Sequence, residues 1–277
     1  MTRRQVLLSL YQPDFPDIRT VPPDLALPPT FETNPSPGIR MKQKDREYRD
    51  TQVHHLLYLP TDWHPDRRYP VIVEYAGNGN YRNEYGDVSL GLPEGSNLGY
   101  GASGGRGYIW LCLPSISPDR LKNQILWWGD VPATIDYCLR TVDRVCRDYG
   151  GDPNRLILAG FSRGSIACNY LGLHNDQIAK LWRAFICYSH YDGVRTNWPF
   201  PGAADRNAAL ERLHRLRGRP QFICHERSVA ETRDYIQSTG VQGRFEFHDL
   251  PFRNHNDAWT LRDIPLRRAL RNWLTNI

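Results

Sequence analysis

The sequence predicts an α/β fold with a mostly parallel central sheet and helices on both faces. From about residue 51 onward, strand-like segments alternate with helix-like segments, which is the pattern of this fold class. Residues 131–149 place apolar side chains three or four positions apart and so predict a long amphipathic helix. The apolar run at residues 155–159 follows that helix and is typical of a short buried strand.

The first 50 residues do not share this alternation. Prolines are frequent between residues 13 and 37, and residues 42–50 are dense in charge. Proline fixes the backbone and donates no backbone hydrogen bond, so this composition favours an extended path. We therefore expect an N-terminal extended arm, residues 1–50, packed on an α/β domain, residues 51–277. The apolar stretch at residues 6–10 is too short for a signal peptide, and we expect no leader.

Seven short segments of the α/β domain predict the strands of its sheet. Each is rich in apolar, β-branched or aromatic residues, as buried strands are. In chain order they are residues 53–59, 69–75, 108–113, 155–159, 184–188, 221–225 and 245–248.

Two helices and two long connections complete the expected domain. Asp130 can cap the helix at residues 131–149, because its carboxylate can accept from a free backbone N–H of the first turn. A closing helix places the apolar side chains of residues 266–274 on one face. Residues 77–106 and 191–207 are longer excursions between the predicted elements, and the second could form a partial lid.

The composition argues against several classes of protein. The net charge of +5 comes from arginines scattered among acids, without the basic stripe typical of nucleic-acid binding. No stretch approaches the roughly 18 apolar residues of a membrane span. The six cysteines form no C-x-x-C pair and no metal-like spacing with histidine. We expect reduced cysteines, a cytoplasmic location, no metal, no cofactor, and neither nucleic acid nor membrane as a partner.

The strongest chemical signal is the pentapeptide Gly160-Phe161-Ser162-Arg163-Gly164. It fits G-x-S-x-G, the nucleophile elbow, in which a serine stands on a sharp strand-to-helix turn. Side chains two positions before and after that serine would collide, and glycine removes their Cβ atoms. A predicted strand precedes the motif and a helical segment of small residues follows it. Ser162 is therefore the candidate nucleophile.

A serine nucleophile needs a base and an acid that orients the base. His255 lies beyond the last predicted strand and before the closing helix, where such elbows find their histidine. Glu226 falls at the end of the predicted strand 221–225 and is the first candidate for the acid. Asp192, which follows the preceding strand, is the rival, because the acid can move one strand over.

Acyl transfer also needs donors for the developing oxyanion. One is the backbone N–H of the residue after the nucleophile, here Arg163. The other is expected from the loop after the strand 69–75, where Gly77 and Asn78 are the candidates. An ordinary glycine turn is the alternative for this loop.

Together these motifs resemble the α/β-hydrolase superfamily over roughly residues 51–277. Residues 58–60, 69–73 and 150–155 are similar to esterases related to feruloyl esterases and polyhydroxybutyrate depolymerases. The sequence departs from that group in lacking a histidine before Gly77. An arginine after the nucleophile resembles glucuronoyl esterases, in which it supports the oxyanion. Arg163 could do the same here, or could face solvent.

Aromatic residues cluster in the long connections near the expected site. They are Tyr81, Tyr85, Tyr100, Trp127, Trp128 and Trp198. Aromatic walls suit sugars and aromatic acyl groups, although aromatic side chains more often serve packing. Among them we expect Tyr81, Tyr100 and Trp128 to bind substrate.

The resemblance implies a serine esterase with residues 51–277 as its catalytic domain. Its substrate is expected to be a small-molecule or saccharide ester, such as a carbohydrate or phenolic ester. Two alternatives remain: a non-catalytic binding protein on a hydrolase scaffold, and a peptidase of the prolyl-oligopeptidase type. The peptidase needs a large gating domain, which 50 proline-rich residues do not supply.

Overall fold

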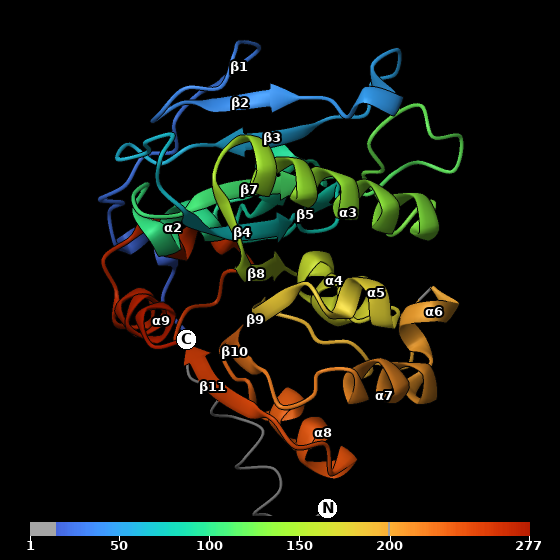
Figure 1. Cartoon of the computed structure of the whole chain (residues 1–277). Helices are drawn as coiled ribbons and strands as arrows, with labels where there is room; N and C mark the ends of the chain where they lie inside the picture. Colours follow the sequence, from blue (N-terminus) through green and yellow to red (C-terminus); the bar gives the residue numbers. More distant parts are fainter. Residues whose placement is uncertain (1–14, 199) are drawn as a thin grey trace, which may run out of the picture.

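The protein, described here by a computed structural model over residues 15–198 and 200–277, is built on a nine-stranded sheet (Figure 1). Its strands are β1 Thr30–Phe31, β2 Arg40–Gln43, β3 His55–Tyr58, β4 Tyr69–Tyr75, β7 Ile109–Leu113, β8 Gly151–Phe161, β9 Trp182–Tyr188, β10 Pro220–Glu226 and β11 Arg244–Leu250. They lie in the order β1-β2-β3-β7-β4-β8-β9-β10-β11. Every neighbouring pair is parallel except the two that β3 makes with β2 and β7. The prediction of a mostly parallel sheet is confirmed.

Helices cover both faces of this sheet. They are α2 Leu98–Ser103, α3 Val131–Asp148, α4 Arg163–Tyr170, α5 Asp176–Ala179, α6 Pro201–Ala204, α7 Arg206–His214, α8 Ala230–Thr239 and α9 Pro265–Thr275. In Figure 1, α2 and α9 lie on one side of the strands, and α3 to α8 lie on the other. A two-stranded ribbon, β5 Tyr81–Arg82 and β6 Val88–Ser89, projects from the connection after β4.

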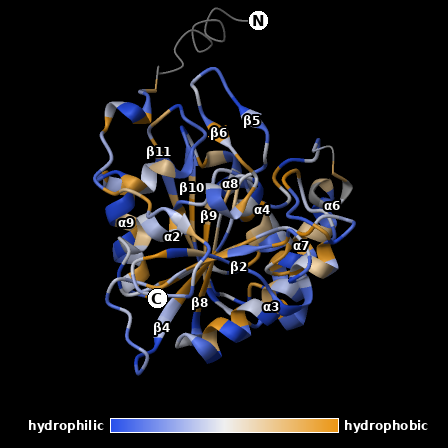
Figure 2. Cartoon of the chain, turned by 90° about the horizontal axis from the view of Figure 1, so that it is seen from above, coloured by the Kyte–Doolittle hydropathy of each residue, from blue (hydrophilic) through white to orange (hydrophobic). Residues whose placement is uncertain are grey.

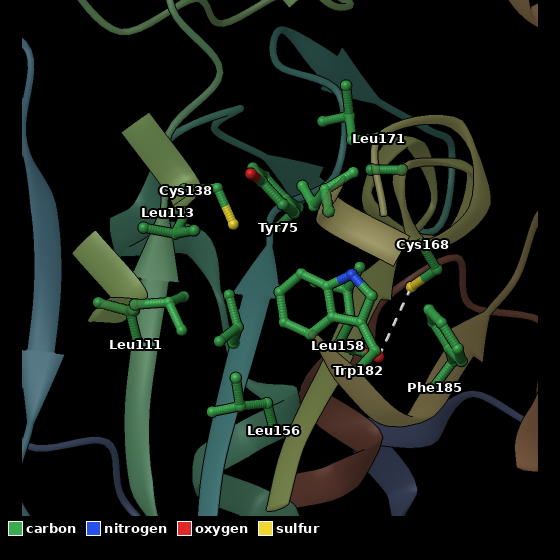
Figure 3. Packing of buried hydrophobic residues seen from close by; sticks show 14 of the residues in the cluster. Tyr75, Leu111, Leu113, Cys138, Leu156, Leu158, Cys168, Leu171, Trp182 and Phe185 are labelled. Atoms are coloured by element: carbon green, nitrogen blue, oxygen red, sulfur yellow. Dashed lines mark hydrogen bonds between the residues drawn. The ribbon is translucent and has the colours of Figure 1, made fainter. Parts of the chain in front are cut away.

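Two apolar cores result, one on each face, because successive strand residues point to opposite sides. Val71, Leu111 and Leu158 pack toward α3 and α4, whereas Ile72 and Trp110 belong to the core beneath α2 and α9. Figure 3 shows part of the first core, and Figure 2 shows hydrophobic residues concentrated along the strands. Because the strands from β7 to β11 are mutually parallel, their carboxyl ends lie at the same edge of the sheet.

The local predictions agree closely with these elements. The strand predicted at residues 69–75 coincides with β4, and α3 begins and ends within one residue of the predicted helix. The arm, however, contributes two strands: β1 and β2 extend the sheet beyond β3. Arg40, at the start of β2, is buried: its guanidinium lies over Trp110 and donates to Pro93 O at 2.7 Å. The apolar stretch at residues 6–10 lies outside the described residues.

Candidate active site

Ser162 stands on a sharp turn between β8 and α4. Its backbone has a positive φ of 53° with ψ −112°, a sparsely populated region that costs a non-glycine residue about 1–3 kcal/mol. A Cβ atom on Gly160 would lie 2.0 Å from the carbonyl oxygen of Gly164, and one on Gly164 would lie 1.8 Å from that of Tyr75. Both glycines are therefore required for the turn. Ser162 N also donates to Tyr188 O at 2.9 Å, which ties the turn to β9.

The structure brings Ser162, His255 and Glu226 into one hydrogen-bonded chain. Ser162 Oγ lies 3.0 Å from His255 Nε2, and His255 Nδ1 lies 2.6 Å from Glu226 Oε1. Glu226 is the last residue of β10, and His255 lies in the connection after β11. A carboxylate can only accept, so the proton of the neutral imidazole is on Nδ1 and Nε2 is left to accept from the serine hydroxyl.

A second serine takes part in this chain. Ser189 follows β9 with a left-handed φ of 86°. Its hydroxyl donates to Glu226 Oε1 at 3.1 Å and lies 3.0 Å from His255 Nδ1. Sequence reasoning did not single it out, and the only signal was its position directly after a predicted strand.

The charges around His255 favour an ionised acid. Burial opposes ionisation of Glu226, but the hydrogen bond from His255 and the nearby histidines outweigh it and lower the pKa of Glu226 to about 2. His190, whose ring centroid lies 5.2 Å from that of His255, behaves differently. Burial holds the pKa of His190 well below its usual range, so it is neutral near pH 7. Near pH 7, His190 therefore adds no positive charge beside the imidazole of His255.

Asp192, the rival acid, makes a separate contact. Its carboxylate accepts from Arg212 Nε at 2.7 Å and from Arg212 Nη2 at 3.0 Å. Both side chains are buried. Asp192 is therefore wrong as the partner of His255: a bidentate arginine, 20 residues further along the chain, has already taken its carboxylate.

The loop of His255 is held by a buried carboxylate from the ribbon β5–β6. Asp87 accepts from His255 N at 2.9 Å, from Asn254 Nδ2 at 3.0 Å and from Asn83 Nδ2 at 2.8 Å. Asn254 Oδ1 in turn accepts from Ile18 N at 2.7 Å, which attaches the arm. These bonds position the imidazole through its own backbone. The sequence alone gave no sign of Asp87.

Comparison with known proteins rests on structure, since no family model and no curated protein matches the sequence. The fluorophosphonate-binding serine hydrolase F of Staphylococcus aureus superposes with a TM-score of 0.56 at 13% identity, over 87% of this chain and 100% of that one. An esterase of Rhizomucor miehei superposes with a TM-score of 0.56 at 11% identity, over 86% of this chain and 82% of that one. A Bacteroides ovatus chain described as a dipeptidyl aminopeptidase IV gives 0.58 at 14% identity, over 86% of this chain but 35% of its own length.

The protein has an α/β-hydrolase fold. This confirms the fold class that the elbow and the strand pattern predicted. Identities of 11–14% limit the likeness to the fold itself, and the resemblance to feruloyl esterases and polyhydroxybutyrate depolymerases stays a prediction.

In this α/β-hydrolase fold the candidate oxyanion donors lie beside the elbow. The backbone N–H groups of Arg163, Gly77 and Asn78 donate no hydrogen bond within the described part of the chain. Asn78 and Arg163 line the same cleft as Ser162. A Cβ on Gly77 would lie 2.8 Å from the ring of Phe161, so glycine lets this loop approach the elbow closely.

The side chain of Arg163 has a structural task. It is buried, and its guanidinium donates to Trp127 O at 2.7 Å, Gly91 O at 3.0 Å and Gln124 O at 3.2 Å. Burial lowers the pKa of Arg163 to about 9. Its Nη atoms join the loop of Gly91 to the loop of residues 124–127. The guanidinium therefore neither faces solvent nor binds the oxyanion.

A cleft of about 550 Å³ opens at Ser162 and His255. Tyr81 lines it as predicted, with its ring centroid 5.0 Å from that of His255. Trp127 and Trp198 form an aromatic wall of the cleft, and their ring centroids lie 5.3 Å apart.

Tyr100 and Trp128 are wrong as cleft residues. Tyr100 lies on α2, and its ring centroid is 6.0 Å from that of Trp110. It packs against the core beneath α2 and α9 and does not line the cleft. Trp128 is buried against Tyr170, 4.5 Å away. Its neighbour Trp127 lines the cleft instead, although the two ring centroids are 6.4 Å apart.

Metal and membrane signals are absent from the described ranges 15–198 and 200–277. No group of three or more His, Cys, Asp or Glu side chains there could hold a metal ion. Nor does any helix in those ranges have the length and apolar character needed to cross a bilayer.

Proposed function

We propose that this protein is a serine hydrolase that cleaves carboxylic esters through an acyl-enzyme on Ser162. The observation that carries the proposal is the unbroken hydrogen-bonded chain from Ser162 Oγ through His255 to Glu226, at 3.0 and 2.6 Å. It combines a nucleophile, a base and an acid that orients the base.

The reaction follows from this order. His255 Nε2 takes the proton of Ser162 as Oγ attacks the ester carbonyl, and Glu226 stabilises the imidazolium that forms. His255 then gives the proton to the leaving alcohol. Water, activated by the same imidazole, attacks the acyl-enzyme and releases the acid and free Ser162.

The backbone donors complete the site. The N–H of Arg163 and an N–H of Gly77 or Asn78 would bind the negative oxygen of each tetrahedral intermediate. The aromatic wall of Trp127 and Trp198 suits a sugar or aromatic group on the ester. Six free cysteines support the proposed cytoplasmic location.

Peptidase activity is the second candidate, because a dipeptidyl aminopeptidase is among the structural neighbours. This chain spans 35% of that neighbour's length. An esterase is also among the neighbours, and we place ester hydrolysis first.

Hydrolysis of p-nitrophenyl butyrate tests the proposal. We expect turnover by the intact protein and a loss of about 10³-fold or more in kcat for Ser162→Ala. Ser238→Ala, at an exposed helical serine, is the control and should keep full activity. Folded protein that neither turns over this ester nor reacts with a fluorophosphonate at Ser162 would instead support the non-catalytic binding protein.

A further inference from the structure

Four arginines line the cleft beside Ser162, and two of them are uncommitted. Arg163 is bound to backbone carbonyls, and Arg253 lies over the Tyr85 ring and contacts Asp17 Oδ2 at 3.2 Å. Arg195 and Arg227 are exposed at the cleft, and within residues 15–198 and 200–277 their guanidinium groups make no hydrogen bond and no ion pair.

The acids of the cleft do not neutralise this pair. Glu226 and Glu84 are the two that line it. Glu226 is already bonded to His255, and Glu84 is exposed, as Arg195 and Arg227 are. Two free cations therefore face one free carboxylate, which leaves the cleft with a positive charge next to the nucleophile.

The backbone that carries Arg195 is fixed by other arginines. Arg206 donates to Gly193 O at 3.0 Å and to Val194 O at 2.9 Å. The buried pair of Arg212 with Asp192 anchors the start of the same turn. Arg195 alone of these three is left for a ligand, and its guanidinium lies 5.3 Å from the ring centroid of Trp198 in the cleft wall.

The backbone of Arg227 is also fixed by a hydrogen bond. It follows Glu226 directly, and its N–H donates to Leu250 O at 2.8 Å. Its backbone is left-handed, with φ 65°, a conformation that glycine would adopt at lower cost. The Arg227 side chain is exposed and makes no hydrogen bond within the described residues.

Both cations line the same cleft as the catalytic imidazole. Arg195 and Arg227 border it together with Ser162 and His255. The rings of Tyr81 and His190, which line the cleft as well, have centroids 5.0 and 5.2 Å from that of His255. A group bound by either guanidinium would therefore lie in the cleft that contains the nucleophile.

We infer that the ester cleaved at Ser162 carries an anionic group, such as a carboxylate, which Arg195 and Arg227 bind. This inference rests on the proposed function and names its substrate class. The planar guanidinium matches a carboxylate through two parallel hydrogen bonds. The bound carboxylate takes no part in bond making; it fixes the position of the ester carbonyl relative to Oγ.

Two esters of the same shape test it: p-nitrophenyl hexanoate and mono-p-nitrophenyl adipate, in which a carboxylate replaces the terminal methyl group. We expect kcat/KM for the adipate to exceed that for the hexanoate by about tenfold at low salt, and less as salt rises. Arg195→Gln and Arg227→Gln should each lower this ratio by about fivefold. Arg106→Gln, an exposed arginine outside the cleft, makes the same change in net charge and should leave the ratio unchanged.

The outcomes separate the two proposals. Turnover of both esters with a ratio of one or less, or a ratio that neither arginine variant changes, overturns the anionic substrate and leaves the hydrolase standing. If a fluorophosphonate modifies Ser162 but neither ester is cleaved, slowing of that modification by monoethyl adipate relative to ethyl hexanoate decides the same question. Failure of both turnover and modification removes the hydrolase, and this inference with it.

Discussion

Glu226 and Asp192 follow adjacent parallel strands, yet their surroundings are opposite. Glu226, at the end of β10, meets His255 at 2.6 Å, and the pKa of its carboxyl falls to about 2. Asp192, four residues after β9, is fully enclosed with Arg212; burial raises its pKa, while the arginine opposes the rise. Glu226 therefore contacts a histidine, whereas Asp192 pairs with an arginine and holds a loop. The comparison shows that strand position alone does not select the acid: the partner that each carboxylate finds does.

The largest effect is expected at Glu226. Glu226→Gln should lower kcat for ester hydrolysis by about 10³- to 10⁴-fold, because an amide can donate to Nδ1 and so favours the unproductive tautomer of His255. Far-UV circular dichroism and thermal unfolding should stay close to those of the parent protein. If the variant keeps its kcat, Glu226 is not the acid.

Asp192→Asn should act on folding rather than on chemistry. Removing one charge of a buried pair leaves Arg212 uncompensated, at a cost of about 3–5 kcal/mol in the free energy of unfolding. Urea titration measures that loss. The kcat of the folded fraction should change by less than tenfold, and a loss as large as that of Glu226→Gln would contradict the distinction between the two carboxylates.

Ser189→Ala sharpens the comparison with a smaller change. Its hydroxyl contacts both Glu226 and His255, so its loss removes a hydrogen bond of about 1 kcal/mol from the oriented pair. We expect kcat to fall about three- to tenfold with little change in KM, measured on the neutral ester. A larger rise in KM than fall in kcat would assign Ser189 to substrate binding instead.

Asp257, a third carboxylate, should affect only the pH dependence of stability. Burial and the nearby Glu74 raise its pKa to about 8, whereas its unfolded value is near 3.8. The folded state therefore holds the proton that the unfolded state loses, and stability should fall as pH rises from about 4 to 8. Asp257→Asn should flatten this slope in urea titrations across that range; an unchanged slope would assign it to other groups.

The elbow, His255 and Glu226 could be predicted from the sequence, because each lies at a strand end or turn that local patterns reveal. The bounds of β4 were predicted for the same reason. Long-range partners were not accessible in this way. The choice between Glu226 and Asp192 depended on Arg212, whose side chain reaches back from α7, and nothing in the local pattern marks that contact.

Substrate contacts were predicted less well than the reacting groups. Trp127 and Trp128 are neighbours in sequence and their ring centroids lie 6.4 Å apart, yet Trp127 lines the cleft and Trp128 is buried against Tyr170. Tyr100 lies in an excursion whose helix α2 packs on the far face of the sheet. Such errors arise because composition identifies an aromatic connection but not the direction of each side chain.

Covalent modification tests the central claim most directly. Folded protein treated with a fluorophosphonate and then digested should show, by mass spectrometry, a single adduct on the peptide that contains Ser162. Ser162→Ala should show none, and Ser238→Ala should react at the rate of the parent protein. An unmodified Ser162 in folded protein, or an adduct on another serine, would contradict the assignment of Ser162 as a nucleophile activated by His255 and Glu226.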